Sequence, residues 1–346
     1  MTAHYQPLQS VHAVHPAHAV HPAHAAPDPV VGLTAHADLP TFVPSSSAIS
    51  GGARLYALVA DLVTLTKPRI TGMVVATMLG GAWLAGHGRH LDHPRPGLSG
   101  ARLALAVLST ALIVAAANTL NMYLERATDG LMARTRNRPL PTGRLSPGAA
   151  LAFGLALAAV SVPALTFGVN AITGLLAAIA LVSYVTLYTP LKRTTTASLL
   201  IGAVPGAIPP LLGWTAVAGR IDWPGVLLFG IMFFWQIPHF LAIATFRSDD
   251  YRRAGLKVLP VERGDRVTRR HIVGYSAVLV AVTLALVPTG VGGHFYTGAA
   301  AVLGAGFFGL GLWGLRPGAG VRWARGLFVA SIVYLVLLLT ALMVSP

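Results

Sequence analysis

Long apolar stretches alternate with polar connections along most of this chain. A helix of about 20 apolar residues crosses the roughly 30 Å hydrocarbon core of a bilayer. The third and fourth stretches are separated by a turn at Gly168-Val169-Asn170. We therefore expect an all-α, polytopic membrane helical bundle in residues 60–345, with transmembrane helices near 69–86, 101–123, 146–168, 170–188, 197–219, 224–246, 271–290, 297–315 and 325–344.

The composition agrees with a membrane protein. Hydrophobic residues make up 54% of the chain and charged residues 10%, whereas a soluble domain carries about a quarter charged residues. Cysteine is absent. This excludes disulfides, thiolate metal sites and covalent haem attachment through paired cysteines.

The basic residues predict the topology. Of the 25 Lys and Arg residues, Arg54 precedes the first span, four lie on one side of the membrane (Arg89, Arg95, Arg102 and Arg220), and the other twenty lie on the opposite side. Basic residues collect in cytoplasmic loops, so we expect the N-terminus in the cytoplasm and the C-terminus outside. The net charge of +14 is then mostly topological, and we expect no nucleic-acid binding.

Residues 1–50 form a tail rich in His, Pro and Ala, in which Ala13-Val-His-Pro-Ala-His18 repeats directly as residues 19–24. Such a segment cannot bury a core, and we expect it to be disordered. Its histidines either bind a transition metal or reflect drift of composition. Neither an Arg-rich presequence nor an early apolar signal is apparent, which favours a bacterial plasma membrane.

Two long polar connections, at 124–145 and 247–270, hold six of the eleven acidic residues: Glu125, Asp129, Asp249, Asp250, Glu262 and Asp265. Acidic and basic residues beside a membrane span are costly and usually functional. We therefore expect the chemistry where these two connections meet.

At the end of the second predicted span and the start of the first connection, Asn121, Glu125 and Asp129 follow one another at intervals of four residues. Such positions advance about 40° per step around a helix, so the three side chains share one face. Oxygen ligands of this kind suit Mg²⁺, which completes its shell with water and substrate phosphates. The pattern favours a metal-bound diphosphate, although a polar helix end emerging into water is the alternative. Guanidinium groups that can neutralise phosphate follow at Arg134, Arg136, Arg138 and Arg144.

The second connection follows Trp235-Gln236-Ile237-Pro238-His239-Phe240 and includes Asp249-Asp250-Tyr251-Arg252. Proline inside a span is expected to kink it and free carbonyls beside a cavity. His239 is either a satisfied structural residue or a group for proton transfer, for a hydrogen bond to substrate or for contact with haem iron. Asp249 and Asp250 form either a second metal-binding patch or a solvated pair that balances nearby arginines.

Three further segments are ambiguous. Tyr188-Thr-Pro-Leu-Lys192-Arg193-Thr194 contains basic residues that either set topology or hold an anionic group. The Gly- and Pro-rich run 201–210 indicates either a helix break beside a cavity or close helix packing. Thr66-Lys67-Pro68-Arg69 is either an ordinary helix start or part of the site.

Together these segments resemble the UbiA superfamily of intramembrane prenyltransferases, and within it the enzymes that farnesylate haem. The resemblance covers about residues 60–345. It rests on the Asn121, Glu125 and Asp129 motif, on the runs 134–139, 188–194, 235–240 and 250–255, and on Leu259-Pro260-Val261. Glu125 stands where aspartate is more usual, and Ala127 where the family often has another acid. Glutamate still offers a carboxylate, on a longer arm.

The resemblance implies nine spans around a central cavity. It also implies farnesyl transfer from farnesyl diphosphate to a vinyl group of haem B, with water addition giving haem O. It assigns Mg²⁺ to Asn121, Glu125, Asp129, Asp249 and Asp250. The catalytic residues that it implies are Asn121, Glu125, Asp129, His239 and Asp250. The substrate-binding residues would be Arg134, Arg138, Tyr188, Lys192, Arg193, Trp235, Gln236, Asp249, Tyr251 and Arg252. Association with haem or terminal-oxidase biogenesis proteins is a further expectation.

Three other functions are compatible with parts of the pattern. An aromatic prenyltransferase of quinone biosynthesis shares the first motif, but the runs 188–194, 235–240 and 249–255 favour haem. A transporter of an anionic lipid or metabolite typically shows related halves, and no clear paired repeat is visible here. A structural oxidase subunit would not need paired acidic motifs.

Overall fold

The computed structural model describes residues 51–87, 98–132 and 135–344. The secondary structure of this part of the chain is helical, without β-strands. Nine of its helical segments are long and apolar enough to cross a membrane: α2 (Pro68–His87), α3 (Gly100–Asp129), α4 (Pro147–Gly168), α5 with its continuation (Ala171–Leu191), α7 (Ser198–Ala218), α8 (Trp223–Phe246), α10 with its continuation (Leu259–Thr289), α11 (His294–Trp313) and α12 (Val321–Val344). The predicted multi-pass membrane bundle is confirmed. The tail 1–50, expected to be disordered, lies outside the described residues.

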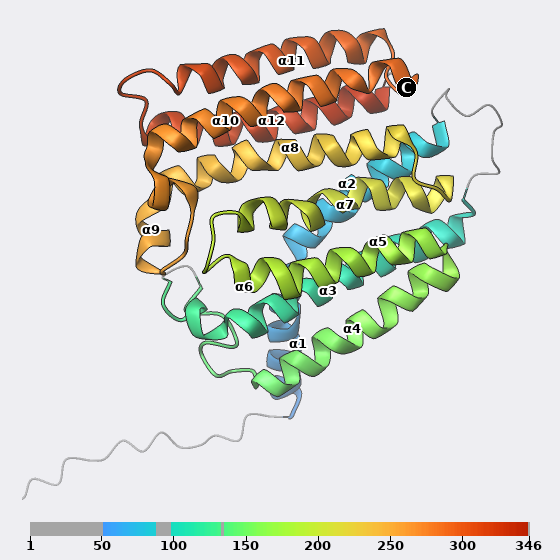
Figure 1. The fold of residues 1–346 in the computed structure, drawn as a ribbon. Helices are drawn as coiled ribbons and strands as arrows, with labels where there is room; N and C mark the ends of the chain where they lie inside the picture. The colour runs from blue at the N-terminus through green and yellow to red at the C-terminus, as the bar shows by residue number, and fades with distance from the viewer. Residues whose placement is uncertain (1–50, 88–97, 133–134, 345–346) are drawn as a thin grey trace, which may run out of the picture. The chain divides into compact units, whose positions relative to one another are not determined.

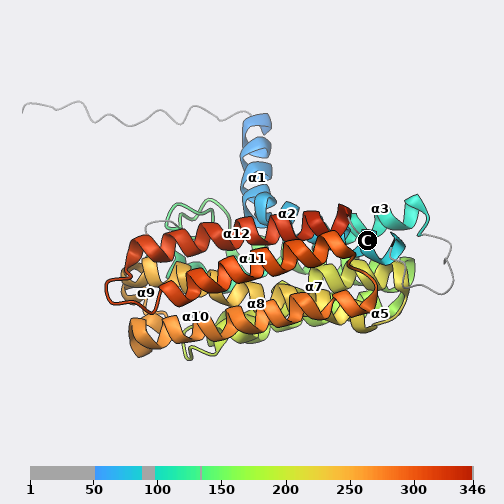
Figure 2. The same cartoon turned by 90° about the horizontal axis from the view of Figure 1, so that it is seen from above.

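The spans lie side by side with roughly parallel axes (Figure 1). Helices α10, α11 and α12 form one flank beside α8, and α3, α4 and α5 form the other. Between them, α7 packs against α2, α5 and α8. It is the most enclosed span, with 67% of its apolar window buried. The sequence pattern did not predict α1 (Gly51–Thr66), which runs across the direction of the spans (Figure 2).

Small residues allow α2 and α7 to approach closely. A methyl group at Gly213 of α7 would collide with the Met78 carbonyl and lie 2.9 Å from the Ala82 nitrogen of α2. A methyl group at Gly81 would likewise collide with the Pro210 carbonyl. Helix α7 continues through Pro205, Pro209 and Pro210. Of the two interpretations of the run 201–210, close packing is confirmed and a helix break is not observed.

Replacing Gly213 by alanine is expected to destabilise the folded protein by about 1–3 kcal/mol, because overpacking forces backbone shifts. Thermal unfolding in detergent measures the effect. Gly274→Ala is the matched control, since a methyl group there meets no atom within 4 Å. Equal melting temperatures for the two variants would contradict the close contact between α2 and α7.

The turn between the third and fourth spans is confirmed at the predicted position. Helix α4 ends at Gly168 and α5 (Ala171–Val182) begins after Asn170. The Asn170 Oδ1 accepts a hydrogen bond from the Thr173 backbone nitrogen at 2.9 Å, and its Nδ2 donates to the Thr215 carbonyl at 2.9 Å. One side chain therefore caps α5 and ties it to α7.

Two predicted boundaries are wrong, because helices continue where apolar character ends. Helix α3 runs six residues beyond the predicted 123, through Asp129. The connection predicted at 247–270 contains α9 (Ser248–Arg253) and the first turns of α10 (Leu259–Ala285). Gly264, with φ of 76°, interrupts those turns, a conformation that suits glycine. Helix α10 continues as a 3₁₀ turn (Val287–Thr289).

Candidate active site

The end of α3 buries three polar side chains. Asn121, Glu125 and Asp129 are 3%, 5% and 1% exposed, as expected for positions that share one face of a helix. Burying a carboxylate is costly unless it is paired. The end of this span is therefore a site whose charges need partners from other segments.

Cations from two other segments provide those partners. The Arg138 Nη1 donates to the Asp129 Oδ2 at 2.8 Å, and the Lys192 ammonium pairs with the Glu125 Oε1. The hydroxyl of Thr135 also donates to the backbone carbonyl of Asp129 at 2.7 Å, which closes the chain back onto the end of α3. Two of the predicted phosphate-binding cations thus contact the predicted acidic motif directly. Arg134 lies outside the described residues.

The fourth span ends in a π-helical turn (Ser183–Tyr188), followed by α6 (Thr189–Leu191). Such turns are rare in proteins, and those that occur often lie at functional sites. The Asn121 Nδ2 donates to the Thr189 hydroxyl at 3.1 Å. That hydroxyl in turn donates to the Tyr184 carbonyl at 2.8 Å. Lys192 lies 5.7 Å from the centre of the half-buried Tyr188 ring. This turn therefore places Tyr188 and Lys192 beside the acidic face of α3.

Lys192 and Arg193 contact both of the polar connections that the sequence expected to meet. The Arg193 guanidinium donates to the Thr128 hydroxyl at 2.6 Å. The Lys257 backbone nitrogen, between α9 and α10, donates to the Lys192 carbonyl at 3.3 Å. Segments far apart in sequence are thereby joined around one cluster of charges.

Asp249 and Asp250 lie on α9 and pair with arginines of their own segment. Asp249 accepts from Arg252 at 2.7 Å, and Asp250 accepts from Arg253 at 2.6 Å and Arg247 at 3.3 Å. Those hydrogen bonds hold the pKa of Asp250 below its usual range. Their side chains are 82% and 45% exposed, so they occupy the solvated position that was the alternative to a second metal patch. Tyr251, the next residue, is half-buried.

The predicted residues of α8 contact neighbouring spans. The Trp235 indole donates to the Ser331 carbonyl of α12 at 2.6 Å. His239 Nδ1 lies 2.7 Å from the Ser331 hydroxyl, and its ring stacks on Trp235 with centres 4.8 Å apart. Gln236 donates to the Ala203 carbonyl of α7 at 2.8 Å. These contacts join α8 to α7 and α12, and α8 continues unbroken through Pro238.

Lys67, which the sequence left undecided, belongs to the charged cluster. It is half-buried between α1 and α2, with φ of 49°, a left-handed conformation uncommon outside glycine. Burial, then repulsion from Arg138, lowers the pKa of Lys67 to about 8, while the Glu125 carboxylate opposes the shift. Only the fold reveals this residue, because Lys67 and Glu125 are distant in sequence.

The donor set at the end of α3 fits a hard cation. Asp129 Oδ1 is buried and has no hydrogen-bond partner within the described residues, so one carboxylate oxygen still has lone pairs to offer. The amide of Asn121 and the carboxylate of Glu125 lie on the same helix face and are oxygen ligands of the type Mg²⁺ prefers. In the described ranges, no three His, Asp or Glu side chains converge as a metal cluster.

Comparison with known proteins identifies the family. The model of the UbiA prenyltransferase family matches residues 74–333. The chain belongs to this family. Curated relatives include a protoheme IX farnesyltransferase of Sorangium cellulosum, 64% identical over 284 residues, which cover 79% of this chain and 100% of the relative. One of the same name from Myxococcus xanthus is 50% identical, covering 82% of this chain and 93% of the relative. The UbiA protein described here is thus a prenyltransferase.

Solved UbiA-like structures share the fold. One from work on digeranylgeranylglyceryl phosphate synthase has a TM-score of 0.71 at 14% identity, covering 83% of this chain and 98% of that chain. A UbiA homologue from Archaeoglobus fulgidus bound to GPP and Mg²⁺ has a TM-score of 0.57 at 17% identity, covering 82% and 99%. The helical arrangement of the UbiA family is therefore present in this chain.

Proposed function

We propose that this UbiA protein transfers the farnesyl group of farnesyl diphosphate to a vinyl group of haem B. Water addition then gives haem O, and diphosphate leaves. The relatives named protoheme IX farnesyltransferase support the choice of both substrates, since one of them is 64% identical over its whole length. The acidic motif at the end of α3 supports diphosphate binding.

The observation that carries the proposal is the pairing of two buried carboxylates with cations from other segments. Glu125 and Asp129 are enclosed at the end of a span, and Lys192 and Arg138 neutralise them. When Mg²⁺ and a diphosphate enter, these cations gain phosphate oxygens as partners. Because its charges are balanced, the site is suited to exchange these internal ion pairs for contacts with Mg²⁺ and the diphosphate.

In this proposal Asn121, Glu125 and Asp129 hold Mg²⁺, which supplies charge neutralisation of the diphosphate. Lys67, Arg138, Lys192 and Arg193 orient the diphosphate and stabilise the negative charge that develops as the allylic C–O bond breaks. The apolar spans keep bulk water from the farnesyl cation until the haem vinyl carbon attacks it. The new C–C bond leaves a cation next to the porphyrin ring, and water captures it with loss of a proton.

Other assignments extend the proposal. His239, Trp235 and Gln236 would contact haem from α8, and Tyr188, Asp249, Asp250, Tyr251 and Arg252 would line the polar entrance. As further Mg²⁺ ligands, the two acids would have to exchange their arginine partners for the cation. A central cavity lined by these residues stays a prediction. The distribution of basic residues supports an N-terminus and site in the cytoplasm, and a C-terminus outside.

Product analysis by mass spectrometry tests the proposed function. Purified protein in detergent is incubated with haem B, farnesyl diphosphate and Mg²⁺, with and without chelator. We expect a chelator-sensitive haem that carries a hydroxyethylfarnesyl group. Prenylation of an aromatic acid with unmodified haem would favour quinone biosynthesis, and binding without turnover of either acceptor would favour transport.

The pH dependence of farnesyl diphosphate binding tests Lys67. Its lowered pKa of about 8 means that the ammonium is charged below pH 8 and neutral above it. If the charged form binds the diphosphate, KM rises about tenfold from pH 7 to 9, following the protonated fraction. Lys67→Arg should abolish this rise because a guanidinium stays protonated. Arg69→Lys is the control, and an unchanged profile in Lys67→Arg would exclude the role.

A further inference from the structure

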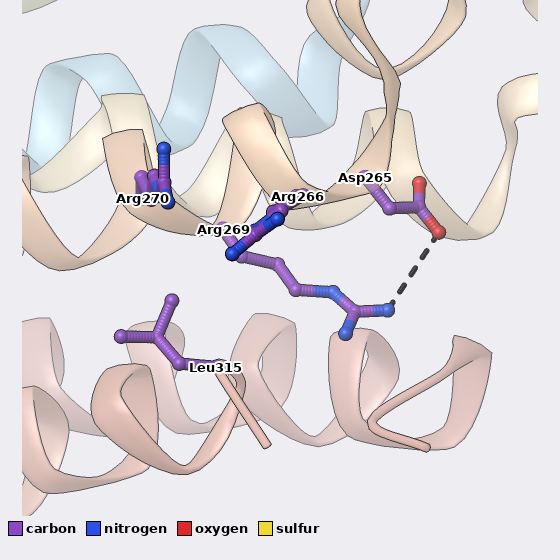
Figure 3. Close-up of a pocket in the computed structure, with 5 residues that line it drawn as sticks. All are labelled: Asp265, Arg266, Arg269, Arg270 and Leu315. Atoms are coloured by element: carbon purple, nitrogen blue, oxygen red, sulfur yellow. Dashed lines mark ion pairs between the residues drawn. The ribbon is translucent and has the colours of Figure 1, made fainter. Parts of the chain in front are cut away.

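A second charged site lies at the same end of the spans as the acidic motif. It is on the other flank of the bundle, formed by α10, α11 and α12. A cavity of about 430 Å³ opens between the start of α10 and the turn that follows α11. It is lined by Asp265, Arg266, Arg269, Arg270 and Leu315 (Figure 3). Three guanidinium groups against one carboxylate give this lining a net charge of +2. The function proposed above uses none of these residues.

One arginine is fixed by the fold. The Arg269 Nη1 donates to the Gly314 carbonyl at 3.3 Å, and its guanidinium lies 5.8 Å from the Trp323 ring centre. Its Nη2 is 3.7 Å from Asp265. Its Nε is buried and finds no acceptor within the described part of the chain. Arg269 thus joins α10 to the end of α11 and to α12, and one of its buried nitrogens is left without an acceptor.

The other two arginines have spare charge. Arg266 and Arg270 are exposed, and no ion pair joins either of them to a carboxylate within the described ranges. The single carboxylate at the cavity, Asp265, is paired with Arg269. Guanidinium groups that converge on a cavity in this way form the preferred recognition site for phosphate oxygens.

The surroundings of the cavity are those of a membrane interface. Trp313, at the end of α11, is 60% exposed, and the Arg316 guanidinium lies 5.7 Å from its ring centre. Tryptophan and arginine collect at the level of lipid headgroups. Leu315, which lines the cavity, is 47% exposed, and Leu312, near the end of α11, is 44% exposed. A ligand here meets cations at one end and apolar side chains at the other.

We propose that this cavity binds the phosphate of an anionic phospholipid, with the acyl chains along the exposed leucines of α11 and the turn after it. The arginine cluster suits a free phosphate ion as well as the phosphate of a lipid. The adjoining apolar surface favours the lipid. Basic pockets between transmembrane helices bind acidic headgroups in this manner. Arg266 and Arg270 contact the phosphate, and Arg269 positions the cavity wall.

Binding of fluorescent phosphatidylglycerol to the purified full-length protein in neutral detergent tests the site. Removing one arginine that contacts the bound phosphate weakens binding of an acidic lipid about fivefold, so Arg266→Gln with Arg270→Gln should raise Kd about thirtyfold. Each of the two single variants should raise Kd about fivefold. Arg322→Gln with Arg325→Gln is the matched control, because both are exposed on α12 and neither lines the cavity.

The expected result is a selective loss. Phosphatidylglycerol binding falls in the cavity variants and stays at the wild-type value in the control, while phosphatidylcholine binds all of them equally. Unchanged phosphatidylglycerol binding in the cavity variants would overturn the proposal, as would an equal loss in the control. Displacement of the lipid by millimolar inorganic phosphate would show a free-anion site instead. Equal melting temperatures establish that the variants are folded.

Discussion

Asp129→Asn is expected to lower kcat/KM for farnesyl diphosphate about a hundredfold to a thousandfold, the scale of losing one electrostatic contact made in a transition state. Asp129 is 1% exposed, gives one oxygen to Arg138 at 2.8 Å and keeps its other oxygen without a hydrogen-bond partner among the described residues. Asparagine preserves the shape and one acceptor but removes the charge that a cation needs. Initial rates at several Mg²⁺ concentrations measure the effect.

Asp222→Asn is the matched control for that variant. Asp222 also pairs with an arginine, Arg220, at 3.3 Å, but it lies between α7 and α8 at the opposite end of the spans. We expect it to retain wild-type activity. A folded Asp129→Asn variant that turns over at the wild-type rate would remove the assignment of metal and diphosphate to the end of α3.

Glu125→Ala is expected to reduce transfer about a hundredfold, and Glu125→Asp by less than about tenfold. Aspartate keeps the carboxylate and is the more usual residue at this position of the family motif. Alanine removes the carboxylate and leaves the partly buried Lys192 without its ion-pair partner, which itself destabilises the fold. Mass spectrometry of haem O formed per minute measures both variants.

A double variant separates the two effects of Glu125→Ala. Glu125→Ala with Lys192→Ala removes the unpaired ammonium along with the carboxylate, so it should regain thermal stability without regaining activity. If Glu125→Ala retains wild-type activity, the carboxylate at 125 has no role in transfer. If the double variant restores activity, the loss in Glu125→Ala comes from the unpaired lysine alone.

The spans were predictable because each is an apolar run long enough to cross a bilayer. The end of α3 and the start of α10 were not predictable, because there the helix includes polar residues beyond the apolar run. At the end of α3 the polar residues are buried against other segments, so the helix continues into sequence that resembles a loop. Helix α1 was missed for a related reason. It lies across the spans (Figure 2), and its 16 residues are too few for a spanning helix.

Within the candidate site, the acidic face was predictable from spacing, since Asn121, Glu125 and Asp129 repeat every four residues. Their partners were less so, because ion pairs between 129 and 138 or 125 and 192 depend on tertiary packing. Lys67 is the clearest case, as its neighbours in sequence give no sign of the carboxylates near it. Asp249 and Asp250 pair with arginines of their own segment and are solvated. The sequence had allowed both this arrangement and a second metal-binding patch.

The π-helical turn at Ser183–Tyr188 has a consequence for insertions and deletions in this part of the chain. Such a turn holds one residue more than an α-helical turn, and each helical residue advances about 100°. Deleting one residue within 183–188 would restore an α-helical turn and leave Lys192 and Arg193 facing Glu125 and Thr128, whereas deleting one residue from α5 would rotate them about 100° away. A one-residue deletion is therefore expected to disturb the site less in this turn than in the α-helical part of the same span.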